Sequence, residues 1–299
     1  MTEVYLSRIG VALGEPVPIA ELPEVVAAGS AANLEKEGLS RCLVSDRAPW
    51  ELAIEAARRT LGEPPSNVDA VVYVYDSYPD DPAPLRVLEA TGLAQIPFYG
   101  AGMAGCGNLS TALQAARCLV LAGVARTVLV ITADACPPGR RLMGANLSVL
   151  SDGAASCLVS AEPGEGAFRL LDVRTAVEAS LHALALDSQT LPVLKATAFG
   201  IRRMGTALFD AGGFSGSEVA HLITHNYGGS AVRIMASAIG VPADRIWCPT
   251  AADIGHCFAA DALINLAALG ESGALRSGDR LLALMTGTAV WGCAYLQTA

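Results

Sequence analysis

The residues best suited to chemistry are a cysteine and the glycines around it, in the run Ala104-Gly105-Cys106-Gly107. A helix is predicted directly after this turn, because apolar residues recur at three- and four-residue spacing over residues 109–120. Cys106 therefore lies at or beside a helix N-terminus, where unpaired N–H groups and the positive end of the helix dipole stabilise a thiolate. The glycines let a substrate approach the backbone closely. A buried structural cysteine is the alternative, since a free cysteine behaves as a small hydrophobe.

Two histidines stand where they could join this cysteine. His225 ends a predicted strand over residues 219–226, and His256 lies in a second glycine-containing turn, Gly255-His256-Cys257, that again precedes a predicted helix. Taken alone, each is more simply explained as a packed core or turn histidine. The other two histidines are better explained as surface or packing residues. The case for His225 and His256 depends on the framework that would bring them to Cys106.

That framework is a duplication. In the first half, a buried strand (68–75), a helix, an apolar segment (96–99), the Cys106 turn, a helix to residue 121 and a strand (127–132) follow one another. The second half has the same order, with a strand (219–226), a helix (230–239), a short strand (245–247), the His256 turn, a helix (258–269) and a strand (280–285). The spacing is nearly equal, which predicts two copies of one βαβ-type unit. We expect an α/β fold in which residues 1–160 carry the nucleophile and residues 161–299 carry the two histidines.

Composition limits the possible functions. The chain has 299 residues, of which 52% are hydrophobic, and a net charge of −9, which argues against nucleic acid or an anionic membrane as a partner. Neither a signal peptide nor a membrane span is expected. The eight cysteines include no CxxC pair and do not form a disulfide scaffold, so we expect a reduced, cytoplasmic protein with no metal.

Several motifs in order resemble the ketoacyl-ACP synthase III branch of the thiolase superfamily, over nearly the whole chain. The Cys106 turn matches that family's nucleophile turn, and His225-Asn226 stands where the family has His-Gln. The other matches are Ile9-Gly10-Val11-Ala12-Leu13-Gly14, Leu150-Ser151-Asp152-Gly153-Ala154-Ala155 and Gly287-Thr288-Ala289-Val290-Trp291-Gly292. The resemblance implies a thiolase-like duplicated α/β fold with αβαβα layers and two pseudo-equivalent halves.

The resemblance also implies roles for single residues. The Cys106 thiolate attacks an acyl thioester to give an acyl-enzyme, and the backbone N–H groups of Cys106 and Thr288 form the oxyanion hole. His225 donates a hydrogen bond to the second substrate's thioester carbonyl, or acts as the base for an attacking hydroxyl or amine. His256 stands where this branch has Asn, which gives a Cys-His-His set like that of the elongating ketoacyl synthases. It also adds a group that titrates near pH 7.

The basic residues expected to contact a carrier are sparse. The helix after His225 lacks the family's basic carrier contacts, and the family's nucleotide-stacking Trp has no match near residues 33–38. Arg41, Arg202-Arg203 and Arg140-Arg141 are the candidates for contacting a phosphopantetheine or an acidic carrier protein, and ordinary solvated surface is the alternative. These departures favour a specialised biosynthetic pathway over a housekeeping role in fatty-acid initiation.

Two chemistries stay open after acyl loading. One is decarboxylative condensation with a malonyl thioester, in which His225 and His256 both stabilise the enolate, and the two-donor site favours it slightly. The other is ester or amide formation on a small acceptor. A non-catalytic partner subunit is a third possibility, although Cys106 and both histidines are present. Substrates would be acyl-CoA or acyl carrier protein and a small-molecule acceptor, without a cofactor. The resemblance also implies a homodimer.

Overall fold

The first half of the chain builds a five-stranded sheet around one buried parallel strand. The computed structural model describes residues 2–75, 83–183 and 190–298. Strand β4 (Ala70–Val74), buried throughout, pairs in parallel with β5 (Phe98–Ala101) and β6 (Thr127–Asp134). The sheet continues antiparallel through β7 (Gly153–Ser160) to β1 (Tyr5–Leu13). Continuous runs of Val, Ile and Ala suit strands that are covered on both faces.

The second half repeats this sheet strand for strand. Strand β9 (Val219–Ile223) pairs in parallel with β10 (Ile246–Trp247) and β11 (Arg280–Thr286). Strands β12 (Val290–Thr298) and β8 (Phe168–Val177) follow antiparallel. A short pairing between β1 and β8 joins the two halves into the order β10-β9-β11-β12-β8-β1-β7-β6-β4-β5. The expected division after residue 160 falls in the connection between β7 and β8, and as a domain boundary it stays a prediction.

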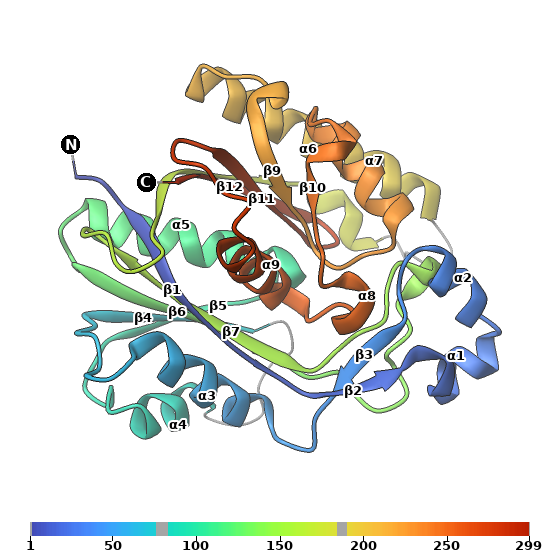
Figure 1. Ribbon diagram of the computed structural model, residues 1–299, viewed down its shortest axis with the longest axis horizontal. Coiled ribbons are helices and arrows are strands. Elements are labelled where there is room, and N and C mark those ends of the chain that lie inside the picture. Colours follow the sequence, from blue (N-terminus) through green and yellow to red (C-terminus); the bar gives the residue numbers. More distant parts are fainter. Residues whose placement is uncertain (1, 76–82, 184–189, 299) are drawn as a thin grey trace.

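The layers are αβαβα, as expected. Helices α5 (Asn108–Leu121) and α9 (Asp261–Glu271) lie between the two sheets (Figure 1), and their leucines form one buried cluster with side chains of both. Helices α3 (Pro49–Leu61) and α4 (Ala83–Ala90) cover the outer face of the first sheet. Helices α6 (Thr190–Gly212) and α7 (Gly229–Ile239) cover the outer face of the second. The two central helices therefore begin close together, in the middle of the molecule.

One excursion of the first half has no counterpart among the described residues of the second half. Between β1 and α3 the chain forms β2 (Glu15–Pro18), α1 (Pro23–Ala28), α2 (Ala31–Lys36) and β3 (Arg41–Val44), with β2 and β3 paired in a separate small sheet (Figure 1). This segment packs around its own small apolar cluster and lies beside α8 (Ala251–Ile254). Strands β2 and β3 and helix α2 are four to six residues long, too short for a periodic sequence pattern to reveal them.

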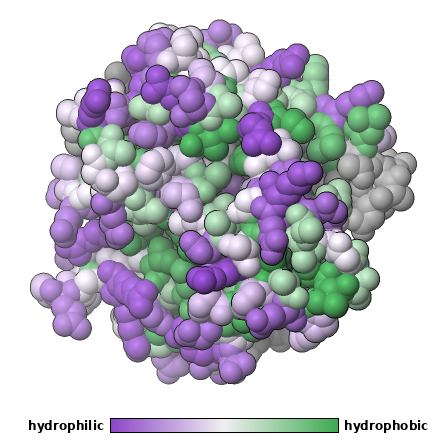
Figure 2. Space-filling model, turned by 45° about the vertical axis from the view of Figure 1, so that its right-hand side comes forward, coloured by the Kyte–Doolittle hydropathy of each residue, from purple (hydrophilic) through white to green (hydrophobic). Residues whose placement is uncertain are grey.

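The long elements match the sequence-based expectations to within a few residues. The predicted strand and helix at residues 219–226 and 230–239 are β9 and α7. The predicted helix over 258–269 is divided into a 3₁₀ turn (Phe258–Ala260) followed by α9. Among the described helices, none has the length and apolarity that crossing a bilayer requires. Figure 2 shows a face on which hydrophilic and hydrophobic residues are interspersed.

Candidate active site

Cys106 lies in a 3₁₀ turn (Gly105–Gly107) that runs directly into α5. It is 8% exposed, and the first turn of α5 contains no acidic residue and no side-chain cap. Buried Asn108 fixes the turn, because its Oδ1 accepts from the N–H of Ala104 at 3.0 Å and its Nδ2 donates to the carbonyl of Tyr75 at 3.1 Å. The positive end of the α5 dipole is therefore left to act on the thiol.

The late loop that was expected to supply the second oxyanion donor lies against this turn. A Cβ on Gly287 would come within 2.1 Å of the carbonyl oxygen of Ala104, and one on Gly107 within 2.8 Å of the carbonyl oxygen of Val290. Glycine at both positions therefore allows the two backbones to touch. Thr288 and Cys106 line the same cavity. Their backbone N–H groups as an oxyanion hole stay a prediction.

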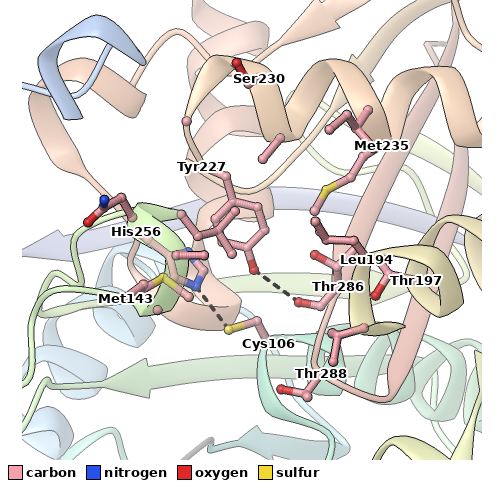
Figure 3. Close-up of a pocket in the computed structure, with 18 of the residues that line it drawn as sticks. Cys106, Met143, Leu194, Thr197, Tyr227, Ser230, Met235, His256, Thr286 and Thr288 are labelled. Atoms are coloured by element: carbon pink, nitrogen blue, oxygen red, sulfur yellow. Dashed lines mark hydrogen bonds between the residues drawn. The ribbon is translucent and has the colours of Figure 1, made fainter. Parts of the chain in front are cut away.

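His256 contacts the Cys106 side chain directly. Its Nε2 lies 3.2 Å from Cys106 Sγ (Figure 3), and its Nδ1 lies 2.5 Å from Oδ2 of Asp261. Since a carboxylate only accepts, Nδ1 carries the ring proton and Nε2 is free to accept the thiol proton. Backbone bonds hold the residue in place, because its N–H donates to Val149 and its carbonyl accepts from Ser151, both at 2.9 Å.

Asp261, which the sequence analysis did not single out, is the residue that organises the histidines. It is the first residue of α9 and is fully buried. Its Oδ1 accepts from the N–H of Cys257 at 2.7 Å and its Oδ2 from the N–H of Asn226 at 2.8 Å. Burial alone would raise the pKa of this carboxyl, but its interactions with His256 and with the nearby His225 lower the pKa below its usual range. Asp261 is therefore an ionised carboxylate at neutral pH.

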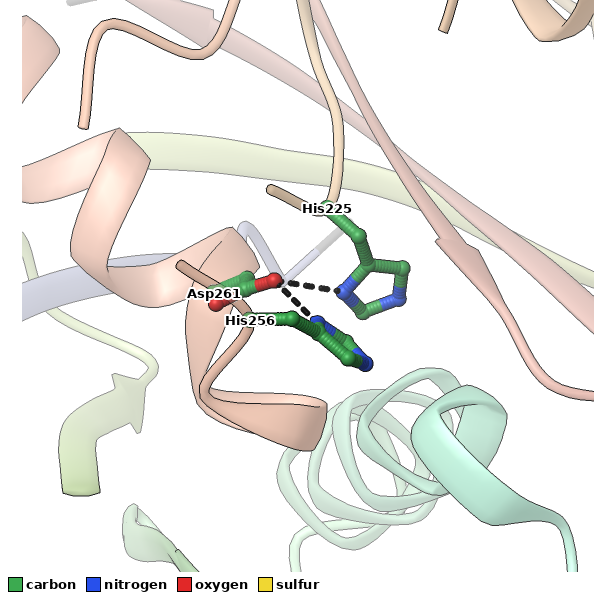
Figure 4. Close-up of side chains that lie close together, drawn as sticks. All are labelled: His225, His256 and Asp261. Carbon is green, nitrogen blue, oxygen red and sulfur yellow. Dashed lines mark hydrogen bonds and ion pairs between the residues drawn. The ribbon is translucent and has the colours of Figure 1, made fainter. Parts of the chain in front are cut away.

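His225 stands behind this pair. Its Nδ1 lies 3.5 Å from Oδ2 of Asp261 (Figure 4), and within the described part of the chain neither ring nitrogen has a hydrogen-bond partner. It is 1% exposed and does not line the cavity that Cys106 and His256 share. Burial lowers the pKa of His225, against the opposing effect of the Asp261 carboxylate, so the ring is neutral at pH 7.

His225, His256 and Asp261 could in principle hold a metal, because their ligand atoms lie within 4.8 Å of one another. The distances argue against it. Two ligands bound to one tetrahedral zinc at about 2.0 Å would be about 3.3 Å apart. The 2.5 Å between His256 and Asp261 is a hydrogen-bond distance instead. The cluster orients an imidazole, as in a nucleophile–histidine–carboxylate triad.

A cavity of about 720 Å³ opens onto Cys106 and His256. Figure 3 shows it extending from Cys106 toward α7, with side chains of α6 on one side. Its polar groups include the Tyr227 hydroxyl, which donates to the carbonyl of Thr286 at 3.3 Å. Most of its wall is apolar, with contributions from Met143, Leu147, Leu194, Ile201, Met235 and Phe258. The size and lining suit a small organic group with an apolar portion.

The arginines proposed as carrier contacts do not line this cavity. Arg41 is about half exposed and lies 3.7 Å from Asp253. Arg202 and Arg203 are exposed on α6, where Arg203 donates to the carbonyl of Val177 at 3.4 Å. Lys36, at the end of α2, does line the cavity, and it was missed because a single lysine in a short helix carries no pattern. Carrier binding by the three arginines stays a prediction.

Arg141 has a structural role instead. It forms a buried two-point ion pair with Asp152, with Nη2–Oδ2 at 2.7 Å and Nη1–Oδ1 at 3.1 Å, and also donates to the carbonyl of Leu150 at 3.0 Å. Asp152 belongs to the same segment that pairs with the backbone of His256. The ion pair therefore supports the position of His256 from behind, and removing one partner would leave a buried charge uncompensated.

Comparison with known proteins gives a consistent result. A family model described as 3-oxoacyl-[acyl-carrier-protein (ACP)] synthase III matches residues 103–179, and the model of its C-terminal part matches residues 209–298. Together they span more than half of the chain and include Cys106, His225 and His256. A Streptomyces coelicolor protein named beta-ketoacyl-[acyl-carrier-protein] synthase III 3 is 29% identical in an alignment of 276 residues that covers 82% of this chain and 82% of that protein.

Solved structures share the fold over nearly the full length. FabH, the 3-oxoacyl-(acyl carrier protein) synthase III of Pseudomonas aeruginosa, superposes with a TM-score of 0.81 at 20% identity, covering 99% of this chain and 98% of that one. ChlB3, described as an acyltransferase, gives a TM-score of 0.84 at 21% identity with the same coverage.

Proposed function

The chain belongs to the ketoacyl-ACP synthase III-like acyltransferases of the thiolase superfamily, and we propose that it carries an acyl group on Cys106 and transfers it to a hydroxyl or amine acceptor. The observation that supports this most is the line of contacts from Cys106 Sγ through His256 to Asp261, at 3.2 and 2.5 Å. It opens onto a largely apolar cavity.

Acylation would begin with transfer of the Cys106 thiol proton to Nε2 of His256. The thiolate attacks the carbonyl carbon of an acyl thioester, and the N–H groups at Cys106 and Thr288 receive the developing oxyanion. The bond to the leaving sulfur then breaks, and the imidazolium returns its proton to that sulfur. The Asp261 carboxylate stabilises the imidazolium and keeps Nδ1 protonated.

Transfer would use the same groups in reverse. The acceptor oxygen or nitrogen attacks the acyl carbonyl carbon while its proton passes to Nε2 of His256. The tetrahedral intermediate collapses, the C–S bond breaks and the Cys106 thiolate leaves. One accessible imidazole is sufficient for this sequence. His225 takes no part in it, which fits its position outside the cavity wall.

Decarboxylative condensation is the second candidate function. Two histidine rings lie 5.2 Å apart beside the nucleophile, and two donors would stabilise a malonyl enolate. That reaction was favoured from the sequence because both histidines were expected to face the substrate. A non-catalytic subunit is disfavoured, because the Cys106–His256–Asp261 contacts are complete.

The proposed donor is an acyl-CoA or an acyl carrier protein that enters past Lys36, whose ammonium could pair with a phosphate at the cavity mouth. FabH and its relatives are named for acyl carrier protein, which supports this class of donor. All eight cysteines are free thiols, in keeping with a reducing cytoplasm. We propose a specialised biosynthetic pathway because His256 and the sparse basic surface depart from the family pattern.

We also propose that two copies pair through the edge strand β5. In the described part of the sheet, β5 pairs with β4 alone, and Phe98 and Tyr99 are 42% and 44% exposed. Met103, between this strand and the Cys106 turn, is 94% exposed. An apolar strand edge of this kind is a surface that proteins normally cover. Light scattering across a dilution series would give twice the monomer mass for a homodimer, and a constant monomer mass would contradict it.

The proposed reaction can be tested by intact-protein mass after incubation with acetyl-CoA, octanoyl-CoA and an octanoyl carrier protein. We expect an adduct of the acyl mass on the native chain and none on Cys106→Ala; Cys118→Ser, which removes an exposed thiol, is the matched control. Isolated acyl-enzyme is then mixed with hydroxyl and amine acceptors or with malonyl-CoA. Discharge by an acceptor supports the proposal, whereas discharge by malonyl-CoA with CO2 release would replace it with condensation. An adduct that persists in Cys106→Ala would contradict both.

A further inference from the structure

Three aromatic rings meet beside the nucleophile, and they differ in what they face. The ring centroids of His225, His256 and Tyr227 lie 4.8 to 5.4 Å from one another. All three side chains are nearly buried, at 1%, 0% and 5% exposure. His256 and Tyr227 line the cavity, and His225 does not. The ring of His225 contacts the rings of both Tyr227 and His256, and these two rings line the cavity.

Tyr227 is held firmly in that position. It follows His225 by two residues, and its N–H donates to the carbonyl of His225 at 2.9 Å. At the other end its hydroxyl donates to the carbonyl of Thr286 at 3.3 Å, so the ring is fixed between the end of β9 and the end of β11. His225 also lies against Asp261, His256 and the Phe258 backbone. A substrate could therefore reach His225 through the space that Tyr227 fills.

We propose that Tyr227 is a specificity-determining residue that separates His225 from the substrate and so selects the acceptor. This inference rests on the proposed acyl-enzyme at Cys106. When a malonyl thioester loses CO2, the bond between its carboxylate and α-carbon breaks and the electron pair becomes an enolate, whose oxygen needs donors. With His225 covered, His256 is the one histidine of the described residues that can reach it. Transfer to an O–H or N–H acceptor needs one base, so covering His225 does not slow that reaction.

The expected change in the rate of decarboxylation is large enough to measure. Removing one preorganised donor to a developing oxyanion costs a factor of about 10² to 10³ in rate in other enzymes. Restoring a donor that Tyr227 covers should therefore raise a rate that is otherwise near background. The aromatic ring, rather than its hydroxyl, is the group that fills the space, so removing the hydroxyl alone should leave the barrier in place.

The experiment measures CO2 release from malonyl-CoA, which requires no acyl-enzyme. Tyr227→Ala and Tyr227→Ser open the space, Tyr227→Phe is the matched control that keeps the ring, and Tyr227→Ala/His225→Ala removes the newly exposed donor. We expect at least a tenfold gain over the native chain for the opening variants. We expect no gain for Tyr227→Phe and loss of the gain in the double variant. Thermal unfolding is recorded for each variant.

Several results would overturn the proposal. A folded opening variant without a gain, an equal gain in Tyr227→Phe, or a gain that survives in the double variant would each do so. Native protein that decarboxylates malonyl-CoA, and loses that activity in His225→Ala, would do so even if no Tyr227 variant folded. Acyl loading of the native chain, measured by intact-protein mass, is an experiment independent of CO2 release. Failure to load would contradict the proposed function while the CO2 measurement still decides the role of Tyr227.

Discussion

The turns before α5 and α9 occupy equivalent places in the two halves but carry opposite chemistry. Each follows a glycine at positive φ, Gly105 and Gly255, and each leads into one of the two central helices. The first half places Cys106 there, and the second places His256. The equivalent turns face each other across the middle of the molecule, which brings Sγ and Nε2 to 3.2 Å.

The difference lies in the first turn of each helix. Helix α5 begins with neutral Asn108, so its positive end is free to act on a thiolate. Helix α9 begins with Asp261, whose carboxylate is stabilised by that helix end and by two backbone N–H groups, and is used to orient an imidazole. One duplicated scaffold thus carries the proposed nucleophile in one half and the proposed base with its orienting carboxylate in the other.

The largest expected effect comes from removing the charge of Asp261, which distinguishes the second turn from the first. Asp261→Asn keeps the side-chain shape but removes the charge that stabilises the His256 imidazolium and fixes its tautomer. We expect acylation of Cys106 to slow by about 10² to 10⁴-fold, the usual contribution of a positioned acid–base group. Stopped-flow acylation followed by mass would measure it. Asp244→Asn, which changes an exposed carboxylate, is the control, and an Asp261→Asn rate within threefold of native would contradict the assignment.

A carboxylate placed in the first turn, like that of Asp261 in the second, tests whether charge is what distinguishes the two turns. Asn108→Asp places a carboxylate at the start of α5, beside Cys106, and removes the donor to the Tyr75 carbonyl. We expect the pH profile of Cys106 alkylation by iodoacetamide to shift upward by about one pH unit, and acylation at pH 7 to slow about tenfold. Asn108→Ala loses this hydrogen bond and the one from the N–H of Ala104, without adding charge. An equal shift in both variants would show that geometry, and not charge, is responsible.

A smaller effect is expected on stability. Burial lowers the pKa of His225, so below about pH 6.5 the unfolded chain binds a proton that the folded chain does not. This contribution to the free energy of unfolding is therefore complete above pH 6.5 and is lost as pH falls toward the lowered pKa. We expect His225→Gln to reduce the loss of unfolding free energy between pH 7 and pH 5.5. Urea unfolding at both pH values would measure it, and an unchanged slope would contradict the neutral, buried state of His225.

Much of this arrangement could be predicted from the sequence because it is periodic or local. The equal order of strands, helices and turns in the two halves predicted the duplicated fold, and glycine beside Cys106 and His256 marked the two turns. The small β2–β3 sheet and α2 were not predicted, because elements of four to six residues carry no period.

The remaining parts of the site depend on contacts between distant segments. Asp261 had one local signal, an acidic residue in the first turn of a predicted helix, but such a residue is ordinarily a cap. Its partners at Asn226 and Cys257 come together through folding. That Tyr227 would line the cavity and His225 would not is a matter of side-chain direction, which the residue order His225-Asn226-Tyr227 does not reveal.

The most direct test of the central claim compares the two histidines under one condition. Single-turnover acylation of Cys106 by octanoyl-CoA is followed by intact mass in His256→Gln and in His225→Gln. The account predicts that His256→Gln slows acylation by at least 10²-fold, because its ring accepts the thiol proton, and that His225→Gln stays within about fivefold of the native rate. Equal losses, or a larger loss in His225→Gln, would contradict the assignment of His256 and Asp261 as the partners of Cys106.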